Sequence, residues 1–466
     1  MGARFHLRSF GCQMNQHDAE RITNVLYHEG YRPTDELEAA DLVLIHTCSI
    51  REKAEQKLYS ELGALWPRKA EHGDLMIGVG GCVAQQEGDR LLERFPQLDF
   101  VFGPQNIVHL PAMIGAARAR ERSLRVDYSE DAQERFELPE RHPEYPPATP
   151  GRAFVTVMEG CDLFCTYCVV PQTRGREVSR PSADLLKEVR ALAESGVLEV
   201  TLLGQTVNAY GRSRPGMTKG EIAFSELIRR IAKIDGIERI RFTSPHPLFM
   251  GEDLIRCYAE VPELCPHIHL PVQSGSSRVL EAMRRRYDRA RYLGIVEQLR
   301  QARPQLSITT DIIVGFPGET REDFEQTLSL MEEVAFTDSF SFKYSPRPGT
   351  PATRRALVPI APEEAQTRLE ELQTLQRRLT LAAHRRRVGT RVPVLVEGQS
   401  RRGGGQQCGR CPQNRVVNFT CSEAVPAGRA LEIYVSGATP HSLLGEVVAV
   451  ARSGGSEKTP LELPLV

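Results

Sequence analysis

Three cysteines stand close together in one short segment of the sequence: Cys161, Cys165 and Cys168, with the spacing C-x3-C-x2-C. Thiolates are the preferred ligands of iron–sulfur clusters, and so close a spacing allows one loop to surround a single cluster. A 4Fe-4S cluster held by three thiolates keeps its fourth iron open, as metal sites that perform chemistry do. The alternatives are a zinc knuckle without its fourth ligand or three unrelated buried cysteines. The place of the motif directly after a predicted strand disfavours both.

A second set of three cysteines is scattered along the sequence, but each member follows a predicted strand. Cys12, Cys48 and Cys82 come directly after the first three short apolar runs of the chain. Because the carboxyl ends of parallel strands meet at one edge of a sheet, we expect the three thiols to converge there. Any one of them alone would be interpreted as an ordinary core residue. Three at consecutive strand ends favour a second three-cysteine cluster, again with an iron to spare.

The remaining cysteines carry weaker signals. The chain has 11 cysteines, an odd number that argues against a disulfide framework and favours metal-binding or catalytic cysteine. Cys408 and Cys411 form a C-x2-C pair with Cys421 nearby. A zinc site there would need a fourth ligand such as His441, and the interpretation without metal is favoured. Cys257 lies in a helical pattern and is interpreted as a core residue.

The N-terminal part of the sequence, which contains Cys12, Cys48 and Cys82, alternates between short apolar runs and segments of helical periodicity. This alternation predicts a doubly wound parallel α/β domain, with helices on both faces of the sheet. Its predicted strands are Arg4–Phe10, Asp41–His46, Leu75–Gly80 and Leu98–Phe102, and its predicted helices are His17–Glu29, Arg51–Trp66 and Gln86–Phe95. The next stretch, Asp131–Gly151, is rich in proline and acidic residues. Since it cannot continue a helix or a central strand, it is predicted to be a linker.

Six βα units in a row follow, which predicts a partial (β/α)6 barrel. The predicted barrel strands are Ala153–Met158, Glu199–Leu203, Arg239–Phe242, His267–Leu270, Ser307–Val314 and Ser339–Tyr344, separated by helices such as Ser182–Ser195 and Arg321–Val334. After a long charged helix, Pro362–Arg387, short β-type runs between glycine turns predict a small all-β barrel. These runs are Val392–Glu397, Arg415–Phe419, Leu431–Val435 and Leu443–Val450. The expected boundaries are 1–120 for the first domain, 121–150 for the linker, 151–384 for the barrel, 385–452 for the β domain and 453–466 for a tail.

Composition places the chain among ordinary globular proteins, with 41% hydrophobic and 26% charged residues. No apolar run approaches the roughly 20 residues that cross a bilayer, and no stretch of signal-peptide length begins the sequence, so we expect a cytoplasmic protein that does not bind membranes. The net charge is −1, yet from Arg385 to Val466 there are 11 Arg and Lys against 6 Asp and Glu. On charge alone this basic tail is a solvated surface, but it can also meet nucleic-acid phosphates.

Longer motifs around both cysteine sets resemble one known family over nearly the whole chain. The matching segments are Gly11–Asn15, Thr47–Glu52, Gly78–Ala84, Met158–Cys161, Cys165–Pro171, Thr173–Gly175, His269–Ser276, Gly315–Thr320 and Asn414–Phe419. Together they resemble the methylthiotransferases of the radical S-adenosylmethionine class. Within that class the residues of these motifs are most similar to those of the MiaB type, the tRNA-2-methylthio-N(6)-dimethylallyladenosine synthases.

The resemblance implies a complete reaction. It implies a radical 4Fe-4S cluster on Cys161, Cys165 and Cys168, whose open iron binds S-adenosylmethionine, and an auxiliary 4Fe-4S cluster on Cys12, Cys48 and Cys82. It also implies a C-terminal TRAM domain that binds RNA. One S-adenosylmethionine would methylate a sulfur carried by the auxiliary cluster, and a second would supply the radical that opens carbon 2 of the adenine. The product would be 2-methylthio-isopentenyladenosine at position 37 of tRNA, next to the anticodon. A radical suits this step because a carbon–hydrogen bond on an adenine ring offers no acidic proton.

Further residues at predicted strand ends and in the basic tail are weaker candidates. Expected contacts of S-adenosylmethionine are Gln205, Gln273, Asp311, Gly315 and Gly318, and expected contacts of RNA are Arg402 and Arg415. The two glycines would let backbone approach a ligand, although ordinary rim and turn chemistry explains them equally well.

Two alternative functions stay open from the sequence. The first keeps the chemistry but changes the substrate, to threonylcarbamoyl-adenosine in tRNA or to an aspartate of a ribosomal protein. The second is an iron–sulfur RNA-binding protein without catalysis. The expected partners are the tRNA anticodon loop, an electron donor such as a flavodoxin or ferredoxin, and the iron–sulfur assembly machinery. The chain itself is expected to be a monomer.

Overall fold

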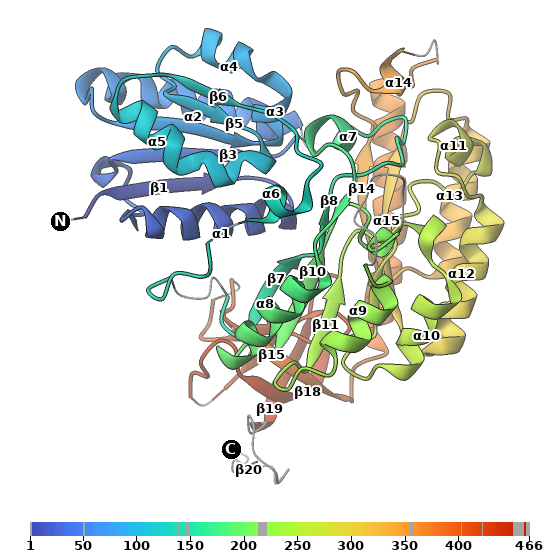
Figure 1. Cartoon of the computed structure of the whole chain (residues 1–466). Helices are drawn as coiled ribbons and strands as arrows, with labels where there is room; N and C mark the ends of the chain where they lie inside the picture. The colour runs from blue at the N-terminus through green and yellow to red at the C-terminus, as the bar shows by residue number, and fades with distance from the viewer. Residues whose placement is uncertain are drawn as a thin grey trace.

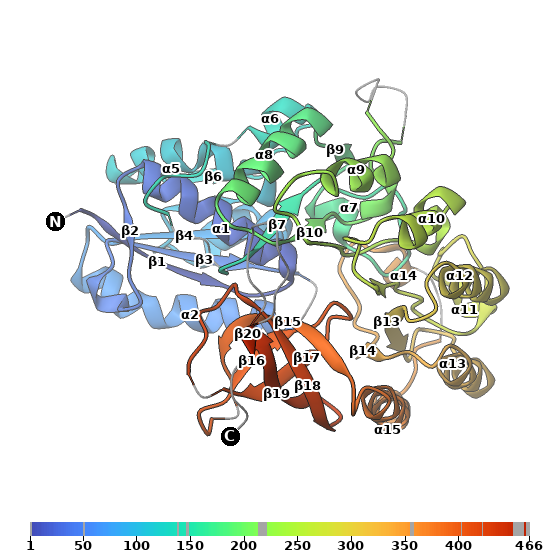
Figure 2. The same cartoon turned by 90° about the horizontal axis from the view of Figure 1, so that it is seen from below.

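The computed structural model describes residues 2–49, 52–137, 139–145, 149–212, 221–354, 358–401, 403–421, 423–450 and 461–462. These residues form three domains in chain order, an α/β domain, a barrel-like α/β domain and a small β domain (Figure 1). The α/β domain (blue) lies beside the central domain (green to orange), and the red β domain lies against the central domain in both views (Figure 1 and Figure 2).

Six parallel strands form the N-terminal sheet, in the order β2-β1-β3-β4-β5-β6. They are β1 (Arg4–Ser9), β2 (Arg32–Pro33), β3 (Leu42–Thr47), β4 (Met76–Gly81), β5 (Phe100–Phe102) and β6 (Ser123–Arg125). One face packs against α1 (Gln13–His28) and α5 (Leu110–Arg118). The other packs against α2 (Glu52–Glu71), α3 (Cys82–Glu87) and α4 (Asp89–Arg94). The predicted doubly wound domain is therefore confirmed, with short 3-10 turns η1 (Leu37–Ala39) and η2 (Pro104–His109) beside it.

Two local predictions in this region were wrong. The single helix predicted at Gln86–Phe95 is divided into α3 and α4 at Gly88, whose φ of +51° breaks the helix. The predicted linker begins with a short helix, α6 (Ala132–Phe136). It forms because the Asp131 carboxylate accepts hydrogen bonds from the first backbone N–H groups, at 2.7 Å from Gln133. The prolines that argued against a helix all lie beyond its last residue.

The central domain contains six parallel strands in two three-stranded sheets, β11-β10-β7 and β12-β13-β14. They are β7 (Arg152–Thr156), β10 (Glu199–Leu203), β11 (Arg239–Phe242), β12 (His267–His269), β13 (Ser307–Val314) and β14 (Asp338–Lys343). A bridge between Ile240 and Leu264 joins the two sheets. Within the described ranges β7 and β14 do not pair, so the barrel is open along that side. This arrangement confirms the predicted partial barrel.

Helices cover the outer face of this open barrel (Figure 1). They are α8 (Ser182–Glu194), α9 (Phe224–Ile231), α10 (Glu252–Glu260), α12 (Arg289–Ala302), α13 (Arg321–Val334) and α15 (Pro362–Arg385). Shorter elements lie in the loops: β8 (Met158–Glu159), α7 (Val170–Thr173), β9 (Val178–Ser179), η3 (Val207–Ala209), η4 (Pro247–Phe249), α11 (Ser277–Ala282) and α14 (Pro351–Arg354). The strand predicted at Ala153–Met158 is divided into β7 and β8, because β8 leaves the barrel to pair with β9. None of the helices in the described part of the chain is both long and apolar enough to cross a membrane.

The C-terminal domain is a closed five-stranded barrel. Its strands are β15 (Arg391–Gln399), β16 (Gln407–Arg410), β17 (Val416–Thr420), β18 (Ala430–Ala438) and β19 (Leu443–Val450), and a short strand β20 (Leu461–Glu462) adds to β19. Parallel pairing of β17 with β19 closes the barrel. The strand β16 was not predicted, because its residues do not alternate between apolar and polar. Its Gly409 is needed for packing, since a Cβ there would lie 2.2 Å from the Leu395 carbonyl oxygen.

Two buried arginines of the central domain hold the β domain in place. Arg239 donates to the carbonyls of Arg410 and Pro393, both at 3.1 Å. Arg241 donates to the carbonyls of Pro412 (2.8 Å) and Cys411 (3.0 Å). The contacts come from β11, so the β domain closes the end of the barrel at which the strands begin. The opposite end, where ligand chemistry gathers in such folds, is left to the N-terminal domain and the cysteine loop.

Candidate iron–sulfur active site

The loop that carries Cys161, Cys165 and Cys168 leaves β8 through a turn that only glycine can form without strain. Gly160 has a φ of +82°, and a Cβ at this position would lie 2.0 Å from the Arg176 carbonyl oxygen. Its N–H donates to Gln205 Oε1 at 2.5 Å. Gln205 follows β10, the strand next to β7, so the start of the cysteine loop is fixed to the neighbouring strand end.

The thiols of this loop belong to an apolar cluster that a buried arginine contacts. Cys161 and Cys165 are buried, and Cys161 Sγ lies 3.2 Å from Thr206 Oγ1. The buried Arg285 donates to Cys165 Sγ at 3.5 Å. Burial raises the pKa of the Cys161 thiol and raises that of Cys168 to about 12. Thiols in such surroundings stay protonated when free, and a metal that binds the sulfur would displace the protons, so that the Arg285 charge would face an anionic site.

The second set converges as expected. Cys12 caps the start of α1 after β1, Cys48 follows β3, and Cys82 is the first residue of α3 after β4. Since these three strands are neighbours in the sheet, their ends lie side by side. At Gly11 a Cβ would lie only 2.4 Å from Cys48 Cβ, so this glycine lets the two strand ends approach.

The three thiols of this set interact with one another. A hydrogen bond to Cys48 is the main cause that lowers the pKa of both Cys12 and Cys82, and the Arg174 charge lowers both further. The same contacts raise the pKa of Cys48, which is buried between its two partners. The set therefore favours anionic sulfur at two positions, as a metal-ligand set requires.

Both sets offer the sulfur donors that iron–sulfur clusters prefer. No group of three His, Cys, Asp or Glu side chains in the described ranges is arranged to hold one metal ion, and this includes the region of Cys408 and Cys411. Each of the two main sets offers three sulfur donors. Each also has a buried polar atom that makes no hydrogen bond of ordinary geometry to a described residue: Gln205 Nε2 by the loop and Arg174 Nη1 by the second set. Soft thiolate donors with a nearby unused N–H fit iron–sulfur clusters.

A buried ion network joins the two sites across the domain boundary. Arg174, just after the cysteine loop, donates to Asp18 of α1 at 2.5 Å. Arg21 of α1 donates in return to Glu159, which precedes the loop, at 2.8 Å. The Glu159 side chain is fully buried, and the Arg135 guanidinium also lies 3.8 Å from it. The segments that carry the two cysteine sets are thus joined at one buried interface between the domains.

Comparison with known proteins gives this arrangement a family. Three family descriptions match successive parts of the chain: Uncharacterized protein family UPF0004 over residues 4–103, the Radical SAM superfamily over 155–331 and the TRAM domain over 385–448. The chain is 51% identical to the tRNA-2-methylthio-N(6)-dimethylallyladenosine synthase of Geobacter sulfurreducens, over 95% of this chain and 97% of that protein. It is 48% identical to the synthase of Myxococcus xanthus, over 99% of this chain and 97% of the relative. The chain belongs to this family.

Solved structures support the fold of these synthases. The chain is similar to the radical S-adenosylmethionine methyltransferase TsrM from Kitasatospora setae, with a TM-score of 0.56 at 16% identity over 76% of this chain and 77% of that one. A second similar structure is the cobalamin-dependent radical enzyme OxsB, with a TM-score of 0.50 at 13% identity over 80% of this chain and 56% of that one. Membership in the synthase family confirms the resemblance seen in the sequence. It also confirms the enzyme class, a tRNA methylthiotransferase, and the expected cofactors, S-adenosylmethionine and two 4Fe-4S clusters.

Three of the weaker candidates lie on loops and strands around the open barrel of this synthase. Gln205 contacts the cysteine loop, as described above. Gln273 adopts a φ of +79°, and its backbone pairs with the end of β13 through Asp311 and Ile313. Asp311 lies on β13 with its carboxylate 3.3 Å from His269 Nε2. All three thus remain candidates for a ligand at this end of the barrel.

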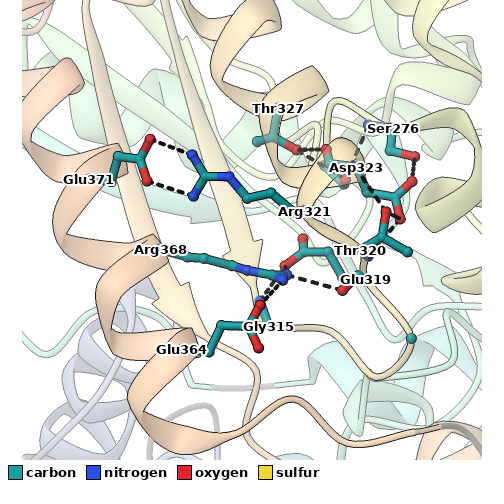
Figure 3. Close-up of polar contacts among 12 residues, drawn as sticks. Ser276, Gly315, Glu319, Thr320, Arg321, Asp323, Thr327, Glu364, Arg368 and Glu371 are labelled. Carbon is teal, nitrogen blue, oxygen red and sulfur yellow. Dashed lines mark hydrogen bonds and ion pairs between the residues drawn. The ribbon is translucent and has the colours of Figure 1, made fainter.

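The two candidate glycines, Gly315 and Gly318, lie in the turn after β13. Gly315 has a φ of +70°, and a Cβ on it would lie 2.8 Å from Ala365 Cβ of α15. Its N–H donates to Glu319 at 2.7 Å, and Arg368 of α15 donates to the same carboxylate at 2.7 Å (Figure 3). Gly318, with a φ of +82°, has open space around it. The turn after β13 is thus braced by α15. At Gly318 the backbone N–H donates to the Val358 carbonyl at 2.8 Å and the carbonyl accepts from Arg278 at 2.6 Å, so its backbone polar groups are also engaged within the protein.

The two arginines expected to contact RNA have different outcomes. Arg402 lies outside the described residues. Arg415 is only 9% exposed, and its guanidinium lies 3.4 Å from Ser307 Oγ and 3.8 Å from Asp338 of the central domain. The structure therefore places Arg415 in the contact between two domains, where burial lowers its pKa, and not on a free surface.

Sequence reasoning missed an aromatic pair inside the open barrel. Phe340 and Phe342 on β14 are 55% and 37% exposed. Phe340 is aligned with Asp311 on β13, on the face opposite to that packed by the helices, and its ring lies 5.8 Å from that of His269. The alternation of β14 predicted the strand, but nothing in the sequence indicated that its apolar face would line an open barrel.

Proposed function

We propose that the chain adds a methylthio group to carbon 2 of N(6)-isopentenyladenosine at position 37 of tRNA, at the junction of its two cysteine sets. The observation that carries this proposal is the pair of three-thiol sites on segments joined by one buried ion network, in a chain about half identical to known synthases. The radical site would consist of Cys161, Cys165 and Cys168, and the auxiliary site of Cys12, Cys48 and Cys82.

The bound cofactors supply the electron that cleaves S-adenosylmethionine and the sulfur that is transferred. The chain's own residues bind and position them. Gln205 fixes the loop through Gly160 and keeps one amide N–H free for a ligand. Arg285 places a buried positive charge at Cys165. The apolar surroundings of the loop exclude water, which protects a radical from side reactions.

The substrate base is proposed to enter through the open side of the barrel. Phe340 and Phe342 offer exposed rings there, and aromatic rings stack on bases and pack against apolar groups such as the isopentenyl chain. Asp311 and His269 are their polar neighbours and suit either the base or S-adenosylmethionine. The C-terminal TRAM domain is proposed to bind the anticodon arm through its basic surface.

The finer partners are also part of the proposal. A flavodoxin or ferredoxin would deliver electrons, and the iron–sulfur assembly machinery would load both clusters. The enzyme is proposed to act as a monomer in the cytoplasm, where its tRNA substrate is found.

The decisive experiment is mass spectrometry of tRNA nucleosides from cells that lack this chain. We expect 2-methylthio-isopentenyladenosine to disappear and isopentenyladenosine to accumulate. Re-expression of the parent chain should restore the product, whereas Cys48→Ala and Cys165→Ala should not. Cys421→Ala is the matched control, because this cysteine lies outside both sets, and it should restore the product.

Other results would support one of the alternative functions instead. Loss of 2-methylthio-threonylcarbamoyl-adenosine instead would identify the other tRNA substrate, and loss of methylthio-aspartate from a ribosomal protein would identify a protein substrate. Persistence of all three modifications, with no 5′-deoxyadenosine formed by the reduced, reconstituted protein, would favour an RNA-binding protein without catalysis.

A further inference from the structure

Arg174 belongs to the radical domain but places its side chain in the N-terminal domain. It follows α7 directly, and α7 packs against α3, whose first residue is Cys82. The residue is only 3% exposed. Its backbone carbonyl accepts hydrogen bonds from Gln105 at 2.8 Å and from Arg135 at 2.6 Å, both on the N-terminal side of the interface. The position of Arg174 is thus fixed by the other domain.

The guanidinium of Arg174 makes an ordinary hydrogen bond through only one of its two ends. Nη2 donates to Asp18 at 2.5 Å, whereas Nη1 is fully buried and makes no hydrogen bond of ordinary geometry within the described ranges. A looser hydrogen bond from the Arg174 side chain contributes to lowering the pKa of Cys82. A buried N–H without an acceptor destabilises the folded protein, and more so on a charged group. A buried N–H of this kind usually has an acceptor, and where the protein offers none, a bound group can accept its hydrogen bond. The guanidinium lies near the starts of both helices that follow these cysteines, because Arg174 binds Asp18 of α1, the helix that Cys12 caps, and follows α7, which packs against α3 and its first residue, Cys82. Its charge accordingly lowers the pKa of both thiols.

We propose that Arg174 is a positioning residue of the auxiliary site, which directs its Nη1–H to a sulfur of the auxiliary cluster or of the group that the cluster carries. The inference rests on the proposed cluster at Cys12, Cys48 and Cys82. Hydrogen bonds and positive charge at cluster sulfur make a cluster easier to reduce and hold the sulfur in place. Because Arg174 comes from the radical domain, the auxiliary site is complete only when the two domains are docked.

The test isolates the auxiliary cluster in the full-length chain by changing Cys161, Cys165 and Cys168 to alanine. After reconstitution this protein should hold about four iron atoms. The protein is labelled with [15N]arginine, reduced, and examined by pulsed electron paramagnetic resonance. We expect a 15N coupling between the reduced cluster and one arginine, and its loss in Arg174→Lys.

The reduction potential provides a second readout. Arg174→Gln should lower the ratio of reduced to oxidised cluster at fixed potential at least tenfold, which for one electron is about 59 mV. The matched control is Arg21→Gln, which removes ion pairs of the same interface with Glu159 and with Asp18, the carboxylate that Arg174 also binds, but leaves Arg174 itself unchanged. Its potential and its 15N coupling should stay those of the parent.

Each outcome decides the matter. A cluster with no arginine coupling, or one whose coupling survives in Arg174→Lys, overturns the inference and leaves the proposed function intact. Equal shifts in the Arg174 and Arg21 variants also overturn it, since they would reflect domain docking alone. Absence of iron from the triple cysteine variant would overturn the proposed auxiliary cluster and the inference together. If Arg174→Gln fails to retain its cluster, the coupling in Arg174→Lys, which keeps the charge, decides.

Discussion

Gly160 is the residue on which the geometry of the radical loop depends most directly. Because a Cβ there would meet the Arg176 carbonyl at 2.0 Å, and φ is +82°, Gly160→Ala must move the turn that presents Cys161. We expect the variant to lose about four iron atoms per chain and nearly all formation of 5′-deoxyadenosine, while the auxiliary cluster remains. Iron analysis and chromatography of the nucleoside measure both effects.

A control for this substitution is available in the same domain. Gly196 has a similar φ of +90° but nothing within 4 Å of a Cβ. Gly196→Ala should therefore cost about 1 kcal/mol of stability from the backbone alone and leave the iron content unchanged. Equal iron loss in both variants would contradict the steric argument.

At the scale of elements, α15 holds the turn after β13 through one buried ion pair. The Glu319 and Arg368 side chains are 1% and 2% exposed, and burial raises the Glu319 pKa although Arg368 is its partner (Figure 3). Glu319→Gln leaves the Arg368 charge without its buried partner, which should destabilise the protein by about 3 kcal/mol. Thermal unfolding of the reconstituted protein measures the loss.

An exposed pair between α13 and α15 provides the comparison. Arg321 and Glu371 are 48% and 39% exposed and lie 2.9 Å apart. Glu371→Gln should cost less than about 1 kcal/mol, because water screens the pair. If the two substitutions had the same effect, burial would not be the cause.

At the scale of the whole molecule, a buried histidine makes the contact between the first two domains sensitive to acid. The His17 ring lies 2.8 Å from Thr156 Oγ1, and burial lowers its pKa from 6.5 to about 4. Below pH 6.5 the unfolded chain binds a proton at His17 that the folded chain does not. The contribution of His17 to the free energy of unfolding is therefore fully present above pH 6.5. It decreases as the pH drops toward 4, by at most about 3 kcal/mol.

A histidine substitution separates this effect from general acid denaturation. His17→Gln retains a hydrogen-bonding side chain without the titration, so its unfolding temperature should fall less between pH 7 and pH 5 than that of the parent. His28→Gln, at an exposed histidine of the same helix, should behave as the parent does. An identical pH dependence in all three proteins would assign the acid sensitivity to other groups.

The β domain is joined to the barrel through Arg415, and salt dependence can test this position. If Arg415 joins domains, as its contacts with Ser307 and Asp338 indicate, Arg415→Ala should lower thermal stability but leave the salt dependence of tRNA binding unchanged. If Arg415 neutralised a phosphate, the slope of log affinity against log salt concentration would decrease by about 0.7–0.9. Binding titrations at several salt concentrations distinguish the two.

Local pattern alone determined most elements of this protein and the ligands within one loop. The strand Ser307–Val314 and the helix Arg321–Val334 were predicted with the bounds that the structure has. Periodicity of two or 3.6 residues reports which face is buried, and this information is local. The spacing of Cys161, Cys165 and Cys168 is likewise local, so the loop could be recognised before any fold was known. The convergence of Cys12, Cys48 and Cys82 needed only the rule that parallel strands end at one edge.

Only the tertiary structure decided what crosses between domains. It placed Arg174 beside cysteines of another domain and buried Arg415, which was expected at the surface. It left the Phe340 ring exposed inside the barrel. It also formed β16, which has no apolar pattern, by pairing Gly409 closely with β15. A side chain's type and local spacing are written in the sequence. Its partner is set by the docking of distant segments, and the energy of that contact depends on burial, which no local pattern contains.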